Sequence, residues 1–149
     1  MKYYARIGRR FVQVKSAKGM FYNNDGTFTE KRTDKSIGIC VHDDFDETII
    51  ASLNECENAV TYGEAESICK AAFPLGEGHI PTSNELFMLK SMDNIKPKDF
   101  VSLWVSDKFN DAYRAHFLYF EPSGVCMSYC GISYREHKVI PFLTIKDRI

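Results

Sequence analysis

The amino-acid sequence predicts an α+β domain, with strands first, two helices in the middle and strands again at the end. Two segments, Thr61-Tyr-Gly-Glu64 and Thr82-Ser-Asn-Glu85, fit the capping box, in which a hydroxyl and a Glu satisfy each other's free backbone donors. The flanking segments are short apolar or alternating runs between turn residues, which is typical of strands. Helices grouped between strands characterise the α+β class. The length of 149 residues is most simply one domain, 1–149.

The N-terminal part of the chain is predicted to form strands and turns. Residues 3–15 suit one or two strands, whose basic residues would lie on the solvent side of an edge. Residues 21–28 are the clearest hairpin, because aromatic residues flank Asn24-Asp25-Gly26, which tolerates positive φ. Residues 37–41 are predicted as a strand buried on both faces, and residues 48–53 as the next strand.

Each capping box opens a run of apolar residues at helical spacing. The first run contains Ala65, Ile68, Cys69 and Ala72, and the second contains Leu86, Leu89 and Met92. Residues 93–99 form a linker, since Pro97 cannot continue a helix. The only tryptophan, Trp104, lies in a short predicted strand at 103–106. Two capped helices followed by this strand predict a hydrophobic centre that the other strands cover.

The C-terminal third is predicted to be an antiparallel hairpin and a final strand. Residues 113–120 and 125–129 are the strands of the hairpin, joined by Glu121-Pro-Ser-Gly124, a turn with Pro at a favoured position and Gly for positive φ. Residues 138–145 are the last strand. Within it, Pro141 is expected at an edge or a bulge, because proline donates no ladder hydrogen bond.

Composition and charge argue against several function classes. The formal net charge of -1 gives no electrostatic reason to expect nucleic-acid binding, and no apolar run is long enough to span a membrane. Residues 1–6 lack the apolar centre of a secretory signal, so we expect a chain that stays in a cytoplasm, leaves by another route or has lost a leader. The five cysteines form no CxxC pair and have no His at metal spacing, which predicts reduced, buried thiols.

Three motifs in succession resemble a known family. Residues 22–41 are similar to a "DGT … GIV" segment, and residues 65–86 are similar to a helix followed by "G-W-R-L-P-T-x-x-E-L". Residues 103–124 are similar to "W-S-S" followed by a hairpin. Together they resemble the bacterial and phage C-type-lectin-like domains of the DUF1566 and Fibrobacter succinogenes major paralogous type, over residues 21–145. His79-Ile80 stands where the family has Trp-Arg-Leu, and the Arg of the family's last strand is absent.

This resemblance implies a C-type-lectin-like fold, with two helices packed on twisted antiparallel sheets, and residues 1–20 as an added N-terminal strand region. It also implies a non-enzymatic binding role, because such domains contact host-surface glycans or protein receptors. We expect a phage or prophage virion component (a fibre, tail or decoration protein) that is made in the host cytoplasm, contacts other virion proteins and forms a homo-oligomer. The alternatives are a secreted or surface bacterial adhesin with a trimmed leader and a cysteine-dependent modifying enzyme.

Neither acidic segment predicts a metal or cofactor. Glu121-Pro-Ser123 shares its Glu-Pro pair with calcium-dependent lectins, but no Trp-Asn-Asp follows, and the segment suits a plain hairpin turn. Residues 42–47 contain four acidic side chains but lack the glycine and spacing of an EF-hand loop. A solvated acidic loop is therefore the favoured interpretation.

Two cysteines are candidates for nucleophilic catalysis. Cys126 and Cys130 are four positions apart in a predicted strand and therefore face the same side. No His or Lys lies beside them in sequence to lower a thiol pKa, which favours a structural role. Three further histidines are scattered singly and predict no catalytic residue: His79, His116 and His137.

The binding hypothesis rests on aromatic and basic residues of the C-terminal third. Tyrosine and arginine often anchor protein surfaces, and tyrosine rings stack on sugars. The candidate ligand-binding residues are Tyr113, Arg114, Tyr119, Tyr129, Tyr134 and Arg135. Two interpretations stay open. Either these residues bind a ligand, as the resemblance to lectin-like folds implies, or alternating tyrosines only coat a twisted sheet.

Overall fold

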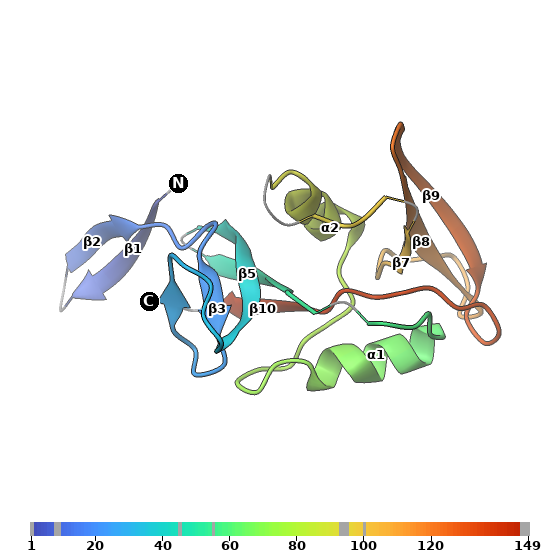
Figure 1. The fold of residues 1–149 in the computed structure, drawn as a ribbon, viewed down its shortest axis with the longest axis horizontal. Coiled ribbons are helices and arrows are strands. Elements are labelled where there is room, and N and C mark those ends of the chain that lie inside the picture. Colours follow the sequence, from blue (N-terminus) through green and yellow to red (C-terminus); the bar gives the residue numbers. More distant parts are fainter. Residues whose placement is uncertain are drawn as a thin grey trace.

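The computed structural model describes residues 2–7, 10–44, 46–54, 56–92, 96–99 and 101–146, with side chains described from residue 16 onward. Its elements confirm the α+β class (Figure 1). In chain order they are β1 (Lys2–Ile7), β2 (Arg10–Lys15), β3 (Phe21–Asn23), β4 (Phe28–Thr29), β5 (Ser36–Asp43), β6 (Glu47–Ser52), α1 (Tyr62–Ala71), α2 (Ser83–Lys90), β7 (Val101–Trp104), β8 (Arg114–Glu121), β9 (Gly124–Gly131) and β10 (Phe142–Lys146).

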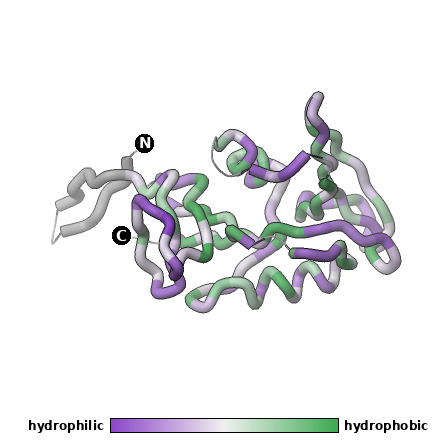
Figure 2. The backbone as a smooth tube through the Cα atoms, viewed as in Figure 1, coloured by the Kyte–Doolittle hydropathy of each residue, from purple (hydrophilic) through white to green (hydrophobic). Residues whose placement is uncertain are grey.

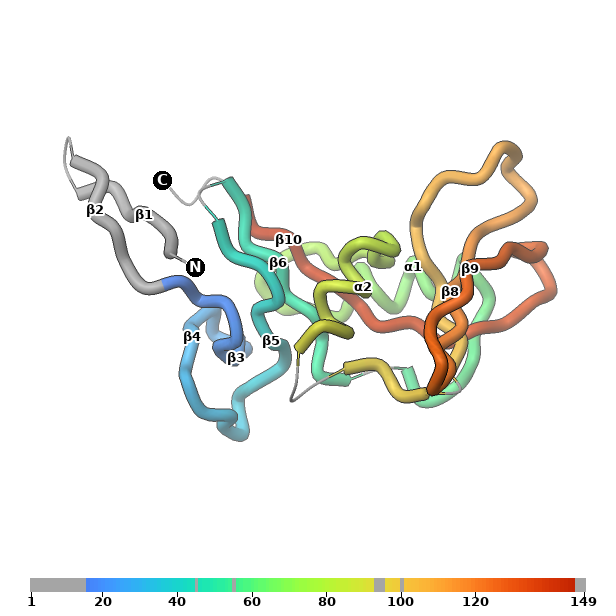
Figure 3. The backbone as a smooth tube through the Cα atoms, turned by 90° about the horizontal axis from the view of Figure 1, so that it is seen from above, coloured from blue at the N-terminus to red at the C-terminus, as the bar shows by residue number. Residues whose placement is uncertain are grey.

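The strands form three antiparallel sheets. β1 and β2 pair with each other, a five-stranded sheet has the order β10-β6-β5-β3-β4, and a three-stranded sheet has the order β7-β8-β9. Figure 3 shows the two larger sheets at opposite ends of the main body, with both helices lying between them. The segment after β9 runs back along the molecule to β10, and Figure 2 shows it change from polar near β9 to apolar where it enters the interior.

One hydrophobic cluster joins both larger sheets to α2. Its members come from β5 and β6, from α2, from the three-stranded sheet and from the return to β10: Ile39, Val41, Ile49, Ala51, Leu86, Leu89, Leu103, Val105, Leu118, Phe120, Ile140 and Phe142. A second cluster lies under α1 and contains Ala65, Cys69 and Trp104. The indole N–H of Trp104 donates to the carbonyl of Val60 at 2.8 Å, which satisfies the one polar group of this fully buried side chain.

Both capping boxes are confirmed. Thr61 and Thr82 are the N-caps, and each exchanges hydrogen bonds with the Glu three residues on. The prediction that Ile68 belongs to the buried face of the first helix is wrong, because this residue remains 36% exposed. α1 buries only Ala65 and Cys69, one turn apart, so a narrow stripe of this helix meets the core.

The strand predictions hold except at the end of the chain. The hairpin at residues 21–28 and the strands at 37–41, 48–53, 113–120 and 125–129 are confirmed within a few residues. The last strand begins at Phe142, because residues 137–138 instead form bridges with Val60 and Leu103. Pro141 directly precedes β10, which is an edge strand as expected. Part of the predicted linker, residues 93–95, lies outside the described residues.

Candidate functional site

The candidate site lies at the open end of the β8–β9 hairpin. The register places Arg114 opposite Gly131 and His116 opposite Tyr129, and one step further the N–H of Ile132 donates to the carbonyl of Tyr113 at 3.0 Å. Arg114 and Tyr129 are therefore diagonal neighbours on the same face of the hairpin, within reach of long and aromatic side chains. The chain then turns at residues 132–134, which brings the next residues back to the same end.

A cavity of about 520 Å³ opens at this end of the hairpin. Five of the six candidate ligand-binding residues line it: Tyr113, Arg114, Tyr129, Tyr134 and Arg135. The remaining lining residues are Cys130, Gly131 and Ser133, so the described part of the wall contains two guanidinium groups and no carboxylate. We refer to this cavity as the Tyr–Arg pocket.

One arginine of the pocket is held in place by two rings and a carboxylate. The guanidinium of Arg114 lies 5.2 Å from the ring centre of Phe109 and 5.5 Å from that of Tyr129, and the two rings are 4.7 Å apart. Its Nε is 3.2 Å from a carboxylate oxygen of Asp111. These contacts limit the rotamers of Arg114 while its side chain stays about half exposed.

The second arginine of the pocket lies over an exposed tyrosine ring. The guanidinium of Arg135 is 5.6 Å from the ring centre of Tyr134, whose side chain is 70% exposed. The ring of Tyr134 packs against the backbone at Gly131, where an added Cβ would collide with it. Glycine at 131 therefore sets the position of Tyr134 in the pocket wall.

Tyr119 is the candidate residue that does not join the others. It lies further along β8, opposite Ser102 on β7 and Cys126 on β9, and is half-buried. Odd and even positions of a strand face opposite sides, and Tyr119 is on the face away from Arg114 and Tyr129. It belongs to the sheet surface rather than to the Tyr–Arg pocket.

A cysteine, a histidine and a serine meet behind the pocket. The thiol of Cys130 is 3.3 Å from Nε2 of His137, and Nδ1 of His137 is 2.7 Å from the hydroxyl of Ser102. The imidazole stacks on Phe117 at 3.9 Å and meets the ring of Trp104 edge-on at 4.7 Å. Sequence reasoning missed this group, because the residues are neighbours only through the return of the chain after β9.

The electrostatics of this group keep both partners neutral. Burial raises the pKa of the Cys130 thiol, although the positive charge of Arg135 lowers it in part. Burial and the same positive charge lower the pKa of His137. The reactive form of cysteine is the thiolate. Cys130 and His137 therefore lie as a thiol acid and an imidazole base, but the thiol is not activated as a nucleophile at neutral pH.

The other thiols occupy different environments, and none of the five forms a disulfide. Cys40 and Cys69 are buried as predicted, and burial raises the pKa of Cys69 to about 12. The prediction of buried thiols is wrong for Cys126, which is exposed because β9 has an open face. The hydrogen bond from Cys126 to Glu121 and the negative charge of that carboxylate raise the pKa of the thiol.

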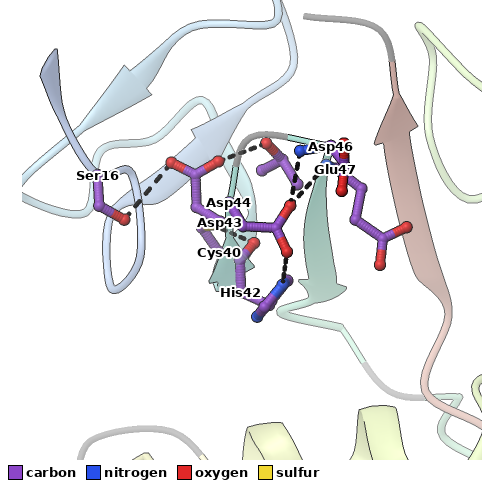
Figure 4. A network of polar contacts seen from close by, with 8 residues as sticks. Ser16, Cys40, His42, Asp43, Asp44, Asp46 and Glu47 are labelled. Carbon is purple, nitrogen blue, oxygen red and sulfur yellow. Dashed lines mark hydrogen bonds and ion pairs between the residues drawn. The ribbon is translucent and has the colours of Figure 1, made fainter. Parts of the chain in front are cut away.

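The acidic residues predicted to lie in a solvated loop instead belong to a network of polar contacts, which Figure 4 shows. Asp43 is completely buried, which corrects the prediction, because β5 continues through it after a register shift between Cys40 and His42. Its carboxylate accepts the backbone N–H of Ala17 at 2.7 Å and the hydroxyl of Thr48 at 2.7 Å. The carboxylate joins β5, β6 and the segment before β3.

Asp44 closes the turn of this loop in a similar way. One oxygen accepts the backbone N–H groups of Asp46 and Glu47 at 2.8 and 2.9 Å, and the other lies 2.7 Å from Nε2 of His42. The hydrogen bonds from the Glu47 backbone and from His42 hold the pKa of Asp44 below its ordinary value. Among the described residues, no group of three or more His, Cys, Asp or Glu side chains is placed to hold a metal ion.

The remaining predicted features are structural. Residues 121–124 form the plain hairpin turn between β8 and β9, with Gly124 at positive φ. His79 lies 3.1 Å from a carboxylate oxygen of Glu85. Burial alone would raise the pKa of Glu85, but hydrogen bonds from His79 and the Thr82 backbone hold it below its ordinary value. Another cavity, of about 250 Å³, lies beside α1 and includes His79 in its wall.

No family model, no curated protein and no solved structure matches the chain. In the part of the chain that the structure describes, no helix is long and apolar enough to cross a membrane.

Proposed function

We propose that this protein is a non-enzymatic binding module whose Tyr–Arg pocket recognises an acidic glycan or an acidic receptor surface. The observation that carries the proposal is the convergence of Tyr113, Arg114, Tyr129, Tyr134 and Arg135, from both strands of a hairpin and the following turn, on one open cavity. A surface coating of alternating tyrosines gives no reason for two arginines and three tyrosines to share a cavity.

The chemistry of the pocket specifies the kind of ligand. Exposed tyrosine rings offer flat apolar faces for the C–H side of a sugar ring, and their hydroxyls offer hydrogen bonds. The two guanidinium groups suit a carboxylate or sulfate, which arginine binds through paired N–H donors. Among the described residues, the pocket lining contains no carboxylate, although Asp111 pairs with Arg114 at 3.2 Å and offsets part of its positive charge.

We propose further that the fold is C-type-lectin-like and that the protein acts as a virion component in host attachment. The two capped helices next to antiparallel sheets, and the position of the pocket after β7, support the lectin-like assignment. A surface adhesin would use the same pocket from a different location. Two observations distinguish these roles. Co-purification with phage particles would support the virion role, and a leader-encoding segment upstream in the gene would support the adhesin.

A glycan array with the purified chain tests the binding function. We expect saturable binding to sialylated, uronic-acid or sulfated glycans, unchanged by a calcium chelator. Arg135→Ala should raise the Kd about tenfold, the loss of one charge-assisted contact. Arg32→Ala, which removes an exposed arginine elsewhere, is the matched control. No binding to any acidic glycan or protein receptor, or equal binding by Arg135→Ala, contradicts the proposal.

A cysteine-dependent enzyme is a second candidate, and one observation favours it. The sequence of contacts Cys130–His137–Ser102 has the order of nucleophile, base and orienting group, and Cys130 also lines the pocket. Alkylation of the protein by iodoacetamide over a pH series tests it. Reaction of Cys130 at neutral pH as a thiolate supports the enzyme, whereas reaction only at alkaline pH supports the binding module.

A further inference from the structure

Among the described strands, β9 is an edge strand with one side open. On the far side of its sheet, the edge of β7 is covered, because the N–H of Trp104 donates to the carbonyl of Lys138 and the N–H of Lys138 donates to Ser102. Within the described part of the chain, β9 pairs only with β8. Figures 1 and 3 show β9 at the outer end of the molecule.

The register identifies the backbone groups on this open edge. The N–H of Val105 donates to the carbonyl of His116, so the backbone groups of His116 point toward β7. The backbone N–H and C=O groups of the alternate residues of β8 therefore point toward β9. There they pair with the backbone groups of Gly124, Cys126, Ser128 and Cys130. The intervening residues of β9 carry their N–H and C=O groups on the outer edge, and these are Val125, Met127, Tyr129 and Gly131.

This edge lacks the features that normally prevent pairing. Natural edge strands are short, charged, interrupted by proline or bulged. β9 spans eight residues, Gly-Val-Cys-Met-Ser-Tyr-Cys-Gly, with no charged residue and no proline. Its pairing with β8 runs through eight consecutive pairs without a register shift. A regular, uncharged and half-exposed edge of this length is suited to accept another strand.

We propose that β9 pairs antiparallel with β9 of a second copy of this chain, with Ser128 on the twofold axis, to form a six-stranded sheet across a dimer. In this register Met127 lies opposite Tyr129 of the second copy and exchanges two backbone hydrogen bonds with it. Val125 and Gly131 form the outer hydrogen-bonded pairs. Every outward N–H and C=O group of residues 125–131 is then paired.

The side chains favour a second copy over an unrelated strand. Facing residues of an antiparallel pair share a face of the sheet, and the same register makes each contact occur twice. The thioether of Met127 meets the ring of Tyr129, a favourable sulfur–aromatic contact. Ser128 meets only itself, so no large or charged group lies on the axis. Cys126 lies opposite Cys130, both small and uncharged.

Pairing in this register also places the two Tyr–Arg pockets at opposite ends of the joined edge. Gly131 lies three residues from the axis in each copy, which separates the two positions by about 20 Å along the strands. Two pockets on one rigid sheet make the dimer bivalent toward a repeating glycan or a clustered receptor. The dimer itself does not depend on the pocket binding any ligand.

Analytical ultracentrifugation of the full chain over a concentration series tests the dimer. We expect a reversible species of twice the 17.1 kDa monomer mass. Met127→Pro removes an outward N–H without removing a bond to β8, and should raise the dimer Kd about 100-fold because symmetry removes the bond twice. Met127→Ala, which keeps the N–H, is the matched control and should dimerise more strongly than the proline variant.

Cross-linking tests the register. In a background with Cys126→Ser and Cys130→Ser, Ser128→Cys places two thiols opposite each other across the axis. Diamide should oxidise them to one intermolecular disulfide, with both thiol hydrogens transferred to the N=N bond of the reagent. Ser128→Cys combined with Met127→Pro is the control and should cross-link far less.

Three results overturn the proposal. The first is a chain that remains monomeric at every concentration, even if it binds extended peptides. The second is a Met127→Pro variant that dimerises as well as Met127→Ala. The third is cross-linking through Met127→Cys, in the same background, instead of through Ser128→Cys. Circular dichroism and the thermal midpoint show whether each variant is folded. None of these readouts uses a glycan, so failure of the dimer and failure of the binding function are separate results.

Discussion

The acidic loop and the Tyr–Arg pocket are two polar clusters with opposite organisation. In the acidic loop, the carboxylates of Asp43 and Asp44 accept hydrogen bonds from the backbone and side chains of their own chain. In the pocket, Tyr134 and Arg135 contact each other but leave most of the tyrosine ring facing solvent. The polar groups of the first cluster are used within the fold, whereas those of the second remain exposed, as our proposed binding function requires.

This difference shows why a cluster of charged residues does not by itself identify a site. Asp43 is more buried than any residue of the pocket wall, but its hydrogen-bonding capacity is used within the protein. A polar group that is already bonded internally has little free energy to gain from a ligand. Substitutions in the two clusters should therefore affect different quantities, stability in one and affinity in the other.

The largest effect is expected at Asp43. Asp43→Ala leaves the buried N–H of Ala17 and the hydroxyl of Thr48 without this acceptor, and should lower the free energy of unfolding by about 3 kcal/mol. Urea unfolding measures this change. Asp46→Ala, at an exposed position of the same loop, should change the free energy by less than about 0.5 kcal/mol. Equal effects of the two variants would show that Asp43 is not an anchor.

Tyr134→Ala should give the second largest effect, on affinity alone. Removing the exposed ring should raise the Kd for the ligand about tenfold, or 1.4 kcal/mol, and leave the thermal midpoint unchanged. Phe87→Ala removes another exposed ring, outside the pocket, and should leave affinity unchanged. A loss of stability in Tyr134→Ala would place this tyrosine with the structural residues instead.

Gly131→Ala tests the pocket without removing any of its binding side chains. The new Cβ collides with the ring of Tyr134 and should displace it, with a rise in Kd of about fivefold, close to 1 kcal/mol. Isothermal titration with the ligand found on the array measures this rise. The same substitution in Tyr134→Ala should have no further effect, and an additive effect of the two would contradict the packing explanation.

The smallest effect concerns pH. The pKa of Glu85 is lowered in the folded protein, so its contribution to stability is present above the ordinary value of 4.5 and is lost as pH falls through the lower, folded value. Glu85→Gln should remove this part of the pH dependence, worth below about 1 kcal/mol, because the amide does not titrate. Unfolding between pH 6 and pH 3 measures the difference.

Sequence reasoning succeeded where the decisive interactions are local. The capping boxes at Thr61 and Thr82, the hairpin turn at Asn24-Asp25-Gly26 and the turn at 121–124 depend on residues within a few positions of each other. It failed at Ile68, since the exposed fraction of a helical side chain depends on the surface that the helix meets.

The candidate site divides in the same way. The sequence identified residue types suited to binding, but spacing along the chain did not separate Tyr119 from the tyrosines that line the pocket. The register of the hairpin shows which side chains of β8 and β9 share a face, and this register is known only from the structure. The contact between Cys130 and His137 had no sequence signal, because the two residues are seven positions apart and a turn lies between them.

By itself, the sequence determined the α+β order, the two helix starts, the main turns and the residue types available for binding. Caps, turns and strand alternation arise from contacts between near neighbours, which a sequence displays directly. Only the tertiary structure decided that Asp43 is buried, that five candidate ligand-binding residues share one cavity and that β9 has an open edge among the described residues. Those properties depend on strand register and on the return of the chain after β9, which join residues far apart in sequence.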